Sequence, residues 1–107
     1  MEIPTHHLAY ITCKDADDAR RIGRTLVLER LAACVNILPG MESHYWWEGK
    51  IESAREAVLI AKTRADAREA LLERTLELHP YEVPCVVFVP VTGGNSDYLD
   101  WISREVG

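Results

Sequence analysis

Residues 42–62, ESHYWWEGKIESAREAVLIAK, have the pattern of a β-hairpin. Gly49 provides the tight turn that a β-hairpin needs, and the aromatic residues Tyr45, Trp46 and Trp47 come just before it. The stretch therefore predicts two antiparallel strands in the middle of the chain.

A strand–helix–strand pattern precedes this hairpin. Residues 8–12 (LAYIT) predict a strand, and residues 15–32 predict a helix with Asp15 as its N-cap. Residues 33–38 predict a further strand, which we expect Pro39-Gly40 to stop.

A helix–strand–helix pattern follows the hairpin. Thr63–Asp66 has the form of a capping box, so a helix is expected to run from there to about Leu78. Residues 86–91 (VVFVPV) predict a strand, and residues 97–106 predict a short terminal helix. Its expected cap is Asn95 or Ser96.

The order of elements is β-α-β-β-α-β with a tail helix, which is the ferredoxin-like or split βαβ arrangement. We predict one domain over residues 1–107, an α+β sandwich with an extended β-hairpin and a short C-terminal helix.

Residues 57–61 and 86–91 are apolar at both odd and even positions, so both faces of the sheet require burial. Two helices cover one face only, so the other face is expected to meet further copies of the chain. Pro90 suits an edge strand or a bulge.

Composition limits the partners and the compartment. The net charge of −5 argues against nucleic acid, which needs a basic face. No apolar run is long enough to span a bilayer, so no membrane partner is expected. The three cysteines, Cys13, Cys34 and Cys85, are an odd number without a framework spacing. Free thiols are typical of a reducing compartment, so we predict a cytoplasmic protein.

Five stretches together closely resemble CutA, the divalent-cation-tolerance family. They are ERLAACVNILPG (29–40), YWWEGKIE (45–52), KT (62–63), HPYEVP (79–84) and PVTGGNSDYLDWI (90–102), in the family's order and spacing. The resemblance implies a homotrimer similar to that of the PII signalling proteins, in which the long hairpin and the last strand join neighbouring sheets. It also implies a role in tolerance of copper and other divalent metals.

The chain departs from the family at the residues proposed there as copper ligands. The family has a cysteine on the first strand where this chain has Ile11, and a His-His pair where this chain has Leu78 before His79. Cys85 stands where the family has a glutamate after HPYxxP. A copper site transferred from the family would therefore be incomplete, and metal binding has to be argued from this chain's own residues.

We predict that Cys13, Cys85 and His79 form such a site for copper or another divalent cation. In the ferredoxin-like order the last strand pairs with the first, so its start lies near the end of the first strand, and His79 leads into that corner. Thiolates and an imidazole suit copper(I) or zinc. The alternatives are that both thiols are buried apolar groups and that His79 caps a helix C-terminus.

The resemblance also implies a cleft between subunits that binds a small ligand. Its expected residues are Trp47, Glu48, Lys62, His79, Tyr81 and Tyr98. A Cys85–His79 nucleophile pair would lack an oxyanion motif and an orienting acid, so we predict no enzyme. The predicted function is a trimeric, cytoplasmic protein of metal tolerance or response that binds divalent cations such as copper. The alternative is a PII-like signalling module that binds a small metabolite, expected to be anionic, in the intersubunit clefts.

Overall fold

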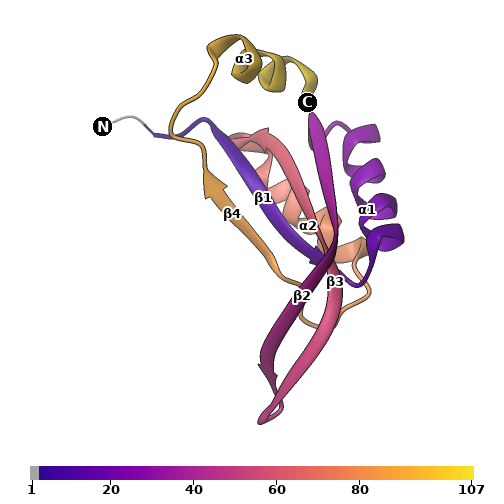
Figure 1. The fold of residues 1–107 in the computed structure, drawn as a ribbon. Coiled ribbons are helices and arrows are strands. Elements are labelled where there is room, and N and C mark those ends of the chain that lie inside the picture. Colours follow the sequence, from indigo (N-terminus) through magenta and orange to yellow (C-terminus); the bar gives the residue numbers. More distant parts are fainter. Residues whose placement is uncertain (1–2) are drawn as a thin grey trace.

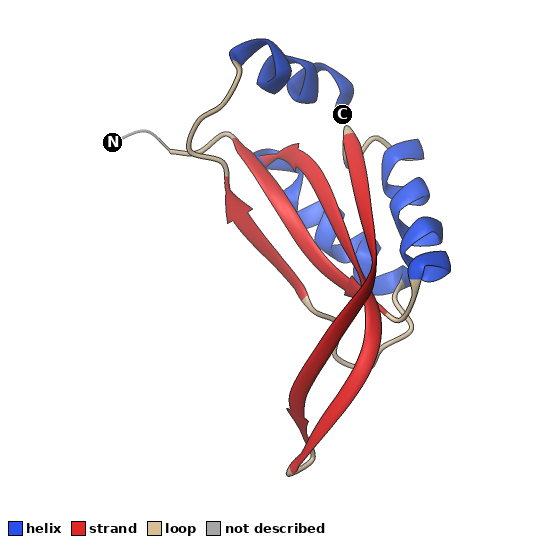
Figure 2. Ribbon diagram, viewed as in Figure 1, coloured by secondary structure: helices blue, strands red, loops and turns tan. Residues whose placement is uncertain are grey.

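A computed structural model describes residues 3–107 and shows one layer of four antiparallel strands with two helices on one face (Figure 1, Figure 2). The strand order is β2-β3-β1-β4. The predicted α+β fold with its βαββαβ order is confirmed. The elements are β1 (His6–Cys13), α1 (Ala16–Leu28), β2 (Cys34–Trp47), β3 (Lys50–Arg64), the 3₁₀ turn η1 (Ala65–Ala67), α2 (Arg68–Leu78), β4 (Val86–Pro90) and α3 (Ser96–Glu105).

The hairpin of β2 and β3 is longer than the stretch 42–62 that predicted it. β2 and β3 stay paired from Cys34 opposite Lys62 to Trp47 opposite Lys50, and their distal half projects beyond the sheet as an arm (Figure 1). The prediction that Pro39-Gly40 stops a strand is wrong, because β2 continues through these residues. The register instead shifts between Leu38 and Met41, and Gly40 adopts a φ of +76°. A β-bulge accommodates residues that would otherwise end a strand.

Two of the three helices begin at the N-cap residue that the sequence predicts. The Asp15 carboxylate accepts a hydrogen bond from the Asp18 backbone N–H at 2.8 Å and begins α1 as predicted. Asn95 accepts from the Asp97 N–H at 3.0 Å and begins α3. The capping box predicted at 63–66 is wrong, because Thr63 is buried within β3 and its hydroxyl donates to the Leu31 carbonyl at 2.8 Å. Helix α2 begins only at Arg68.

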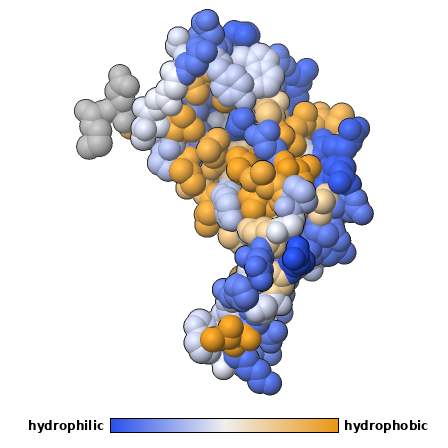
Figure 3. All heavy atoms as spheres, in the orientation of Figure 1, coloured by the Kyte–Doolittle hydropathy of each residue, from blue (hydrophilic) through white to orange (hydrophobic). Residues whose placement is uncertain are grey.

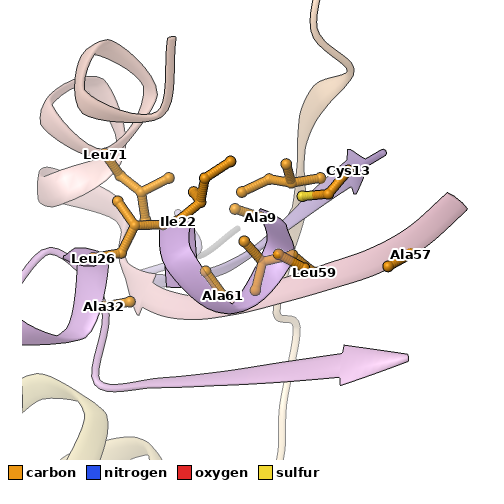
Figure 4. Packing of buried hydrophobic residues seen from close by; sticks show 11 residues of the cluster. Ala9, Cys13, Ile22, Leu26, Ala32, Ala57, Leu59, Ala61 and Leu71 are labelled. Atoms are coloured by element: carbon orange, nitrogen blue, oxygen red, sulfur yellow. The ribbon is translucent and has the colours of Figure 1, made fainter. Parts of the chain in front are cut away.

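The core lies between the helices and one face of the sheet, which we call the inner face. Alternate residues of β1 point into it, and α1 and α2 close it from the other side (Figure 4). The cluster contains Ala9, Ile11 and Cys13 of β1, Ala19, Ile22 and Leu26 of α1, Ala32, Ala57, Leu59 and Ala61 of β3, and Leu71 of α2. Each fully buried Ile or Leu contributes about 1.5–3 kcal/mol by leaving water.

The opposite face of the same strands, the open face, carries no such layer. Tyr10 pairs with Ile60 on one side and with Val87 on the other, and Leu8 pairs with Val89. Val87 and Val89 remain 51 % and 47 % exposed. Figure 3 shows the resulting apolar patch over the middle of the sheet. The prediction that these strands are apolar on both faces is confirmed.

The terminal elements lie at the edges of this sheet. Pro90 belongs to β4, which is an edge strand as its missing N–H predicts. Helix α3 packs at one end of the sheet, where Arg64 donates to the Ser103 carbonyl at 2.9 Å and His6 bonds the Ser103 hydroxyl at 2.8 Å. Within the described residues, no helix combines the length and the apolar character that crossing a bilayer requires.

Candidate functional site

A groove of about 680 Å³ opens on the open face where the arm leaves the sheet. One wall is the arm, and the other is the segment that links α2 to β4 (Figure 1). Its floor comes from Tyr10 and Thr12 of β1, because the alternation of the strand turns these two residues away from the core.

Aromatic rings and carboxylates dominate the lining of this groove. The aromatic residues are Tyr10, Tyr45, Trp47 and Tyr81, and the acidic residues are Glu42, Glu56 and Glu82. No lysine or arginine is among the lining residues, which all lie in the described chain. The site is therefore negatively charged and partly apolar.

Glu56 is the most enclosed of the three acids, with 8 % of its surface exposed. Its Oε2 accepts a hydrogen bond from the Tyr81 hydroxyl at 2.7 Å. The pKa of Tyr81 is raised well above its usual range, first by burial and then by this hydrogen bond. None of the ion pairs formed within residues 3–107 includes Glu56. A buried carboxylate held by one hydroxyl and by no cation favours a positively charged ligand.

Two sulfur atoms also face the groove. The Tyr10 hydroxyl donates to Met41 Sδ at 3.6 Å, and Cys85 lies half-buried beside Thr12. The Thr12 backbone N–H donates to the Cys85 carbonyl at 3.3 Å, which joins the segment before β4 to β1. Thioether and thiolate ligands suit soft metal ions.

His79 is turned away from the groove and against the backbone of β1. Its Nε2 donates to the Thr12 carbonyl at 2.8 Å, and its Nδ1 accepts from the Tyr81 N–H at 3.2 Å. The ring also packs against Tyr81, with centroids 4.7 Å apart. Both ring nitrogens are therefore engaged, and His79 serves to fix the corner that presents Tyr81 to Glu56.

The structure does not bring Cys13, Cys85 and His79 together as a metal site. Because Thr12 lies opposite Cys85, the next residue, Cys13, points to the inner face, where it is fully buried. Burial, with the nearby Asp18 and Glu56 carboxylates, raises the pKa of Cys13 to about 12. Within residues 3–107, no group of three His, Cys, Asp or Glu side chains is arranged to hold a metal ion.

The six residues predicted for an intersubunit cleft separate into distant groups within one chain. Trp47 and Tyr81 line the groove, with His79 behind Tyr81, and Glu48 lies at the tip of the arm with a φ of +50°. The other two form their own cluster near α3.

In that second cluster the Lys62 ammonium donates to the Tyr98 hydroxyl at 3.1 Å, and this bond raises the pKa of Lys62. The Tyr98 ring stacks on Trp101, with centroids 5.5 Å apart. Lys62 lies six positions after Glu56 on β3, a distance of about 20 Å. One chain therefore offers two separate polar clusters rather than one cleft.

Sequence reasoning missed Tyr10, Met41 and Glu56. A signal was present for Glu56, because a single acid directly before the apolar run AVLIA marks the point where the buried part of the strand begins. Tyr10 shares its strand parity with Thr12, which places both on one face. Met41 had no such signal, since the bulge at Gly40 sets its direction.

Comparisons with known proteins agree on one family. The model of the family described as CutA1 divalent ion tolerance protein matches residues 7–105. The divalent-cation tolerance protein CutA of Thermus thermophilus is 46 % identical over 97 residues, which cover 91 % of this chain and 94 % of that protein. The chloroplastic protein CutA 1 of Oryza sativa is 44 % identical over 98 residues, which cover 92 % of this chain. The chain spans only about half of that plant protein, 55 % of its length.

A solved structure supports the same assignment. The periplasmic divalent cation tolerance protein CutA from Archaeoglobus fulgidus superposes with a TM-score of 0.92 at 40 % identity. The superposition covers 95 % of this chain and 99 % of the other.

Proposed function

Because this chain belongs to the CutA1 divalent ion tolerance protein family, we propose that it acts in metal tolerance by binding divalent cations such as copper. The observation that carries the proposal is the family match over residues 7–105. The acid-lined groove supports it. Its lining contains three carboxylates, which attract cations, and no lysine or arginine, which would repel them. The proposal assigns the chain a binding role and no catalytic one.

We propose Cys85 as the metal ligand retained from the predicted set. Its thiol shares the groove with Met41 and Glu56, whereas Cys13 lies on the other face of the sheet and both nitrogens of His79 are engaged. Among residues 3–107 no three such ligands meet, so we place the remaining ligands on neighbouring copies.

The proposed assembly is a homotrimer that forms through the open face and the arm. The apolar patch over the sheet supports it, since monomers rarely leave several hundred Å² of contiguous apolar surface in water. Leu38, Val87 and Val89 are each about half exposed, and Trp46 at the end of the arm is 72 % exposed. A second copy would bury these side chains.

The proposed compartment is the cytoplasm. The three cysteines are free thiols, which is typical of a reducing compartment. The words periplasmic and chloroplastic belong to the names of the relatives from Archaeoglobus fulgidus and Oryza sativa.

A second candidate function is binding of a small molecule in the groove. Its volume of about 680 Å³ is within the range of small-molecule sites, and such sites combine apolar walls with a few polar groups. Trp47 and Tyr81, both predicted for a cleft, lie in it.

An anaerobic titration of the reduced, metal-free protein with Zn²⁺ and Cu²⁺ tests the first function. We expect saturable binding that Cys85→Ser weakens by about tenfold or more, the loss typical of a damaged metal site. Cys13→Ser is the matched control on the inner face and should leave the affinity unchanged. Absence of saturable binding, or equal affinity in wild type and Cys85→Ser, would contradict the proposal.

A further inference from the structure

We infer that residues 65–69, which form η1 and the start of α2, are an acid-sensitive lid that opens when the buried His7 beneath them takes up a proton. This segment, called the lid, lies with α2 on the inner face of the sheet, opposite to the open face. Its contacts with His7 are made within one chain, so they do not depend on the proposed assembly. The inference adds a regulatory property to the proposed metal function.

His7 is a buried imidazole without a hydrogen bond. Alternate residues of β1 point to the inner face, and His7 is the first of them, with 7 % of its surface exposed. Within residues 3–107, neither ring nitrogen has a hydrogen-bond partner. A neutral imidazole therefore leaves one donor and one acceptor unpaired, and an imidazolium would leave two donors and a charge. Burial of an unpaired charge costs far more than burial of an unpaired neutral group, so the closed structure favours neutral His7.

The lid begins beside His7 and places a positive charge near it. Thr63 pairs with His7, and the chain turns into η1 two residues later. His7 and Arg68 then meet at one ring. The centroid of the Phe88 ring lies 6.4 Å from the centroid of the His7 ring and 6.0 Å from the guanidinium carbon of Arg68. The imidazole and the guanidinium are therefore neighbours under the start of α2.

The charges that act on His7 are all positive among the described residues. They belong to Arg68 in the lid and to His6, its neighbour on β1, and after burial they lower the pKa of His7. The residues paired with His7 on the two adjacent strands, Thr63 and Pro90, carry no charge. A proton on His7 would therefore add a second buried positive charge beside Arg68.

The two acids of the lid do not offset these charges. The Asp66 carboxylate accepts from Arg64 Nε at 3.0 Å, and its side chain is 74 % exposed. Glu69 is exposed on the first turn of α2. Neither is among the charges that act on His7. The imidazolium would have no counter-ion unless water reached it.

Few contacts hold the lid closed. The N-cap residues of η1 and α2, Arg64 and Ala67, make no side-chain hydrogen bond to the helix start. Arg68 takes part in none of the ion pairs within residues 3–107. A backbone hydrogen bond of 2.8 Å from the Ala65 N–H ties the lid to the segment before β1. An uncapped helix start frays at a lower free energy than the packed turns that follow it, so this is the part that can open to let water reach His7.

Proton uptake shifts the lid toward its open state. In the open state His7 is in water and has the ordinary pKa of about 6.5, whereas its pKa is lower in the closed state. The closed state is therefore fully favoured above about pH 6.5 and loses its advantage as the pH falls below that value. Between pH 7.5 and pH 5.5 the equilibrium constant for opening should rise several-fold, up to about tenfold.

Hydrogen exchange of the wild-type chain at pH 7.5 and pH 5.5 tests the lid. Mass spectrometry follows the amides of residues 65–72, and the rates are corrected for the intrinsic effect of pH on exchange. Residues 22–28 of α1, on the same face, are the internal reference. We expect the corrected opening of residues 65–72 to rise several-fold at pH 5.5 and that of the reference to stay constant. Equal opening of residues 65–72 at the two pH values, or an equal rise in the reference, would overturn the inference.

Two variants test the origin of the effect, and one serves as a control. His7→Leu removes the proton acceptor and should abolish the difference between the two pH values. Arg68→Met removes the neighbouring charge but keeps an apolar contact with Phe88, and should make the difference smaller. Arg24→Met removes an exposed charge from α1 and should keep the wild-type difference. If His7→Leu does not fold, Arg68→Met gives the answer. A wild-type difference in His7→Leu, or in Arg68→Met where only that variant folds, would overturn the inference.

Discussion

The two faces of the sheet are built from the same strands and have opposite relations to the rest of the chain. On the inner face, Ile11 and Leu59 are fully covered by α1 and α2. On the open face, Val87 and Val89 are about half exposed beside an acidic groove. Both faces are apolar in their middle, so composition alone does not distinguish the face that forms the core from the face that we propose for assembly.

The two faces show that a shift of one residue along a strand moves a side chain from the core to the groove. Cys13 and Cys85 lie at neighbouring positions of β1 and the segment before β4, yet the first belongs to the core and the second to the groove. Side chains alternate along a strand, so a shift of one residue exchanges the faces. Substitutions on the inner face should change stability, and those on the open face should change assembly and binding.

Thiol reactivity gives the largest expected contrast. With its pKa raised to about 12, Cys13 holds about one thousandth of the thiolate at pH 8 that it holds in the unfolded chain. In single-cysteine variants, Ellman's reagent should modify Cys13 about 30-fold or more faster after unfolding in urea than before, because the folded thiol is both protonated and buried. Cys85 should react with the reagent while the protein is folded. Equal rates for Cys13 in the two states would show that it does not lie in the core.

A cavity on the inner face should cost the next largest free energy. Leu59→Ala removes a fully buried side chain and should lower the free energy of unfolding by about 2–5 kcal/mol. Urea denaturation at a fixed protein concentration measures this loss. Val89→Ala, at a half-exposed position of the open face, is the control and should cost under about 1.5 kcal/mol at the same concentration. A reversed order would show that the open face is the principal core.

A charge on the open face should break the proposed assembly. Val87→Glu would bury a carboxylate against a neighbouring copy, at a cost of several kcal/mol. Light scattering after size-exclusion chromatography should show a mass that falls from three copies toward one. Leu76→Glu, exposed on α2 on the other side of the sheet, should keep the wild-type mass. An unchanged mass for Val87→Glu would place the interface elsewhere.

The smallest expected effect is a pH dependence at the inner face. His7 is 7 % exposed, neither ring nitrogen has a hydrogen-bond partner within residues 3–107, and its pKa is lowered by burial and then by the charges of Arg68 and His6. The unfolded chain therefore protonates His7 first, so stability present above about pH 6.5 is lost as the pH falls, by at most about 1.4 kcal/mol per unit.

His7→Leu should reduce this slope between about pH 5 and pH 7, as measured by urea denaturation at each pH. His44→Leu, exposed on the arm, should retain the wild-type slope. A wild-type slope in His7→Leu would mean that His7 takes up its proton in the folded chain as readily as in the unfolded one.

Turns, helix caps and strand positions could be predicted from the sequence where a single residue determines them. Gly49 placed the turn of the arm, Asn95 capped the last helix, and Pro90 identified an edge strand. Thr63 misled the prediction of a cap, because its burial in β3 uses its hydroxyl elsewhere.

The site could be predicted only in part, because the register of the strands determines which side chains meet there. The sequence placed Cys13 and Cys85 in the same corner, but the pairing of Thr12 with Cys85 puts them on opposite faces. Trp47 and Tyr81 were predicted for a ligand site and do line one groove. Glu56 joins them because it directly precedes the buried Ala57 on β3, so the alternation of the strand turns its carboxylate to the open face.

Sedimentation equilibrium of the wild-type chain in metal-free buffer would show whether the open face is the contact face of the protein. We expect one species with three times the 12.1 kDa mass of a single chain, unchanged on dilution into the low micromolar range. A mass of one chain over the same range would mean that the apolar open face stays in water and that it is not an interface between copies.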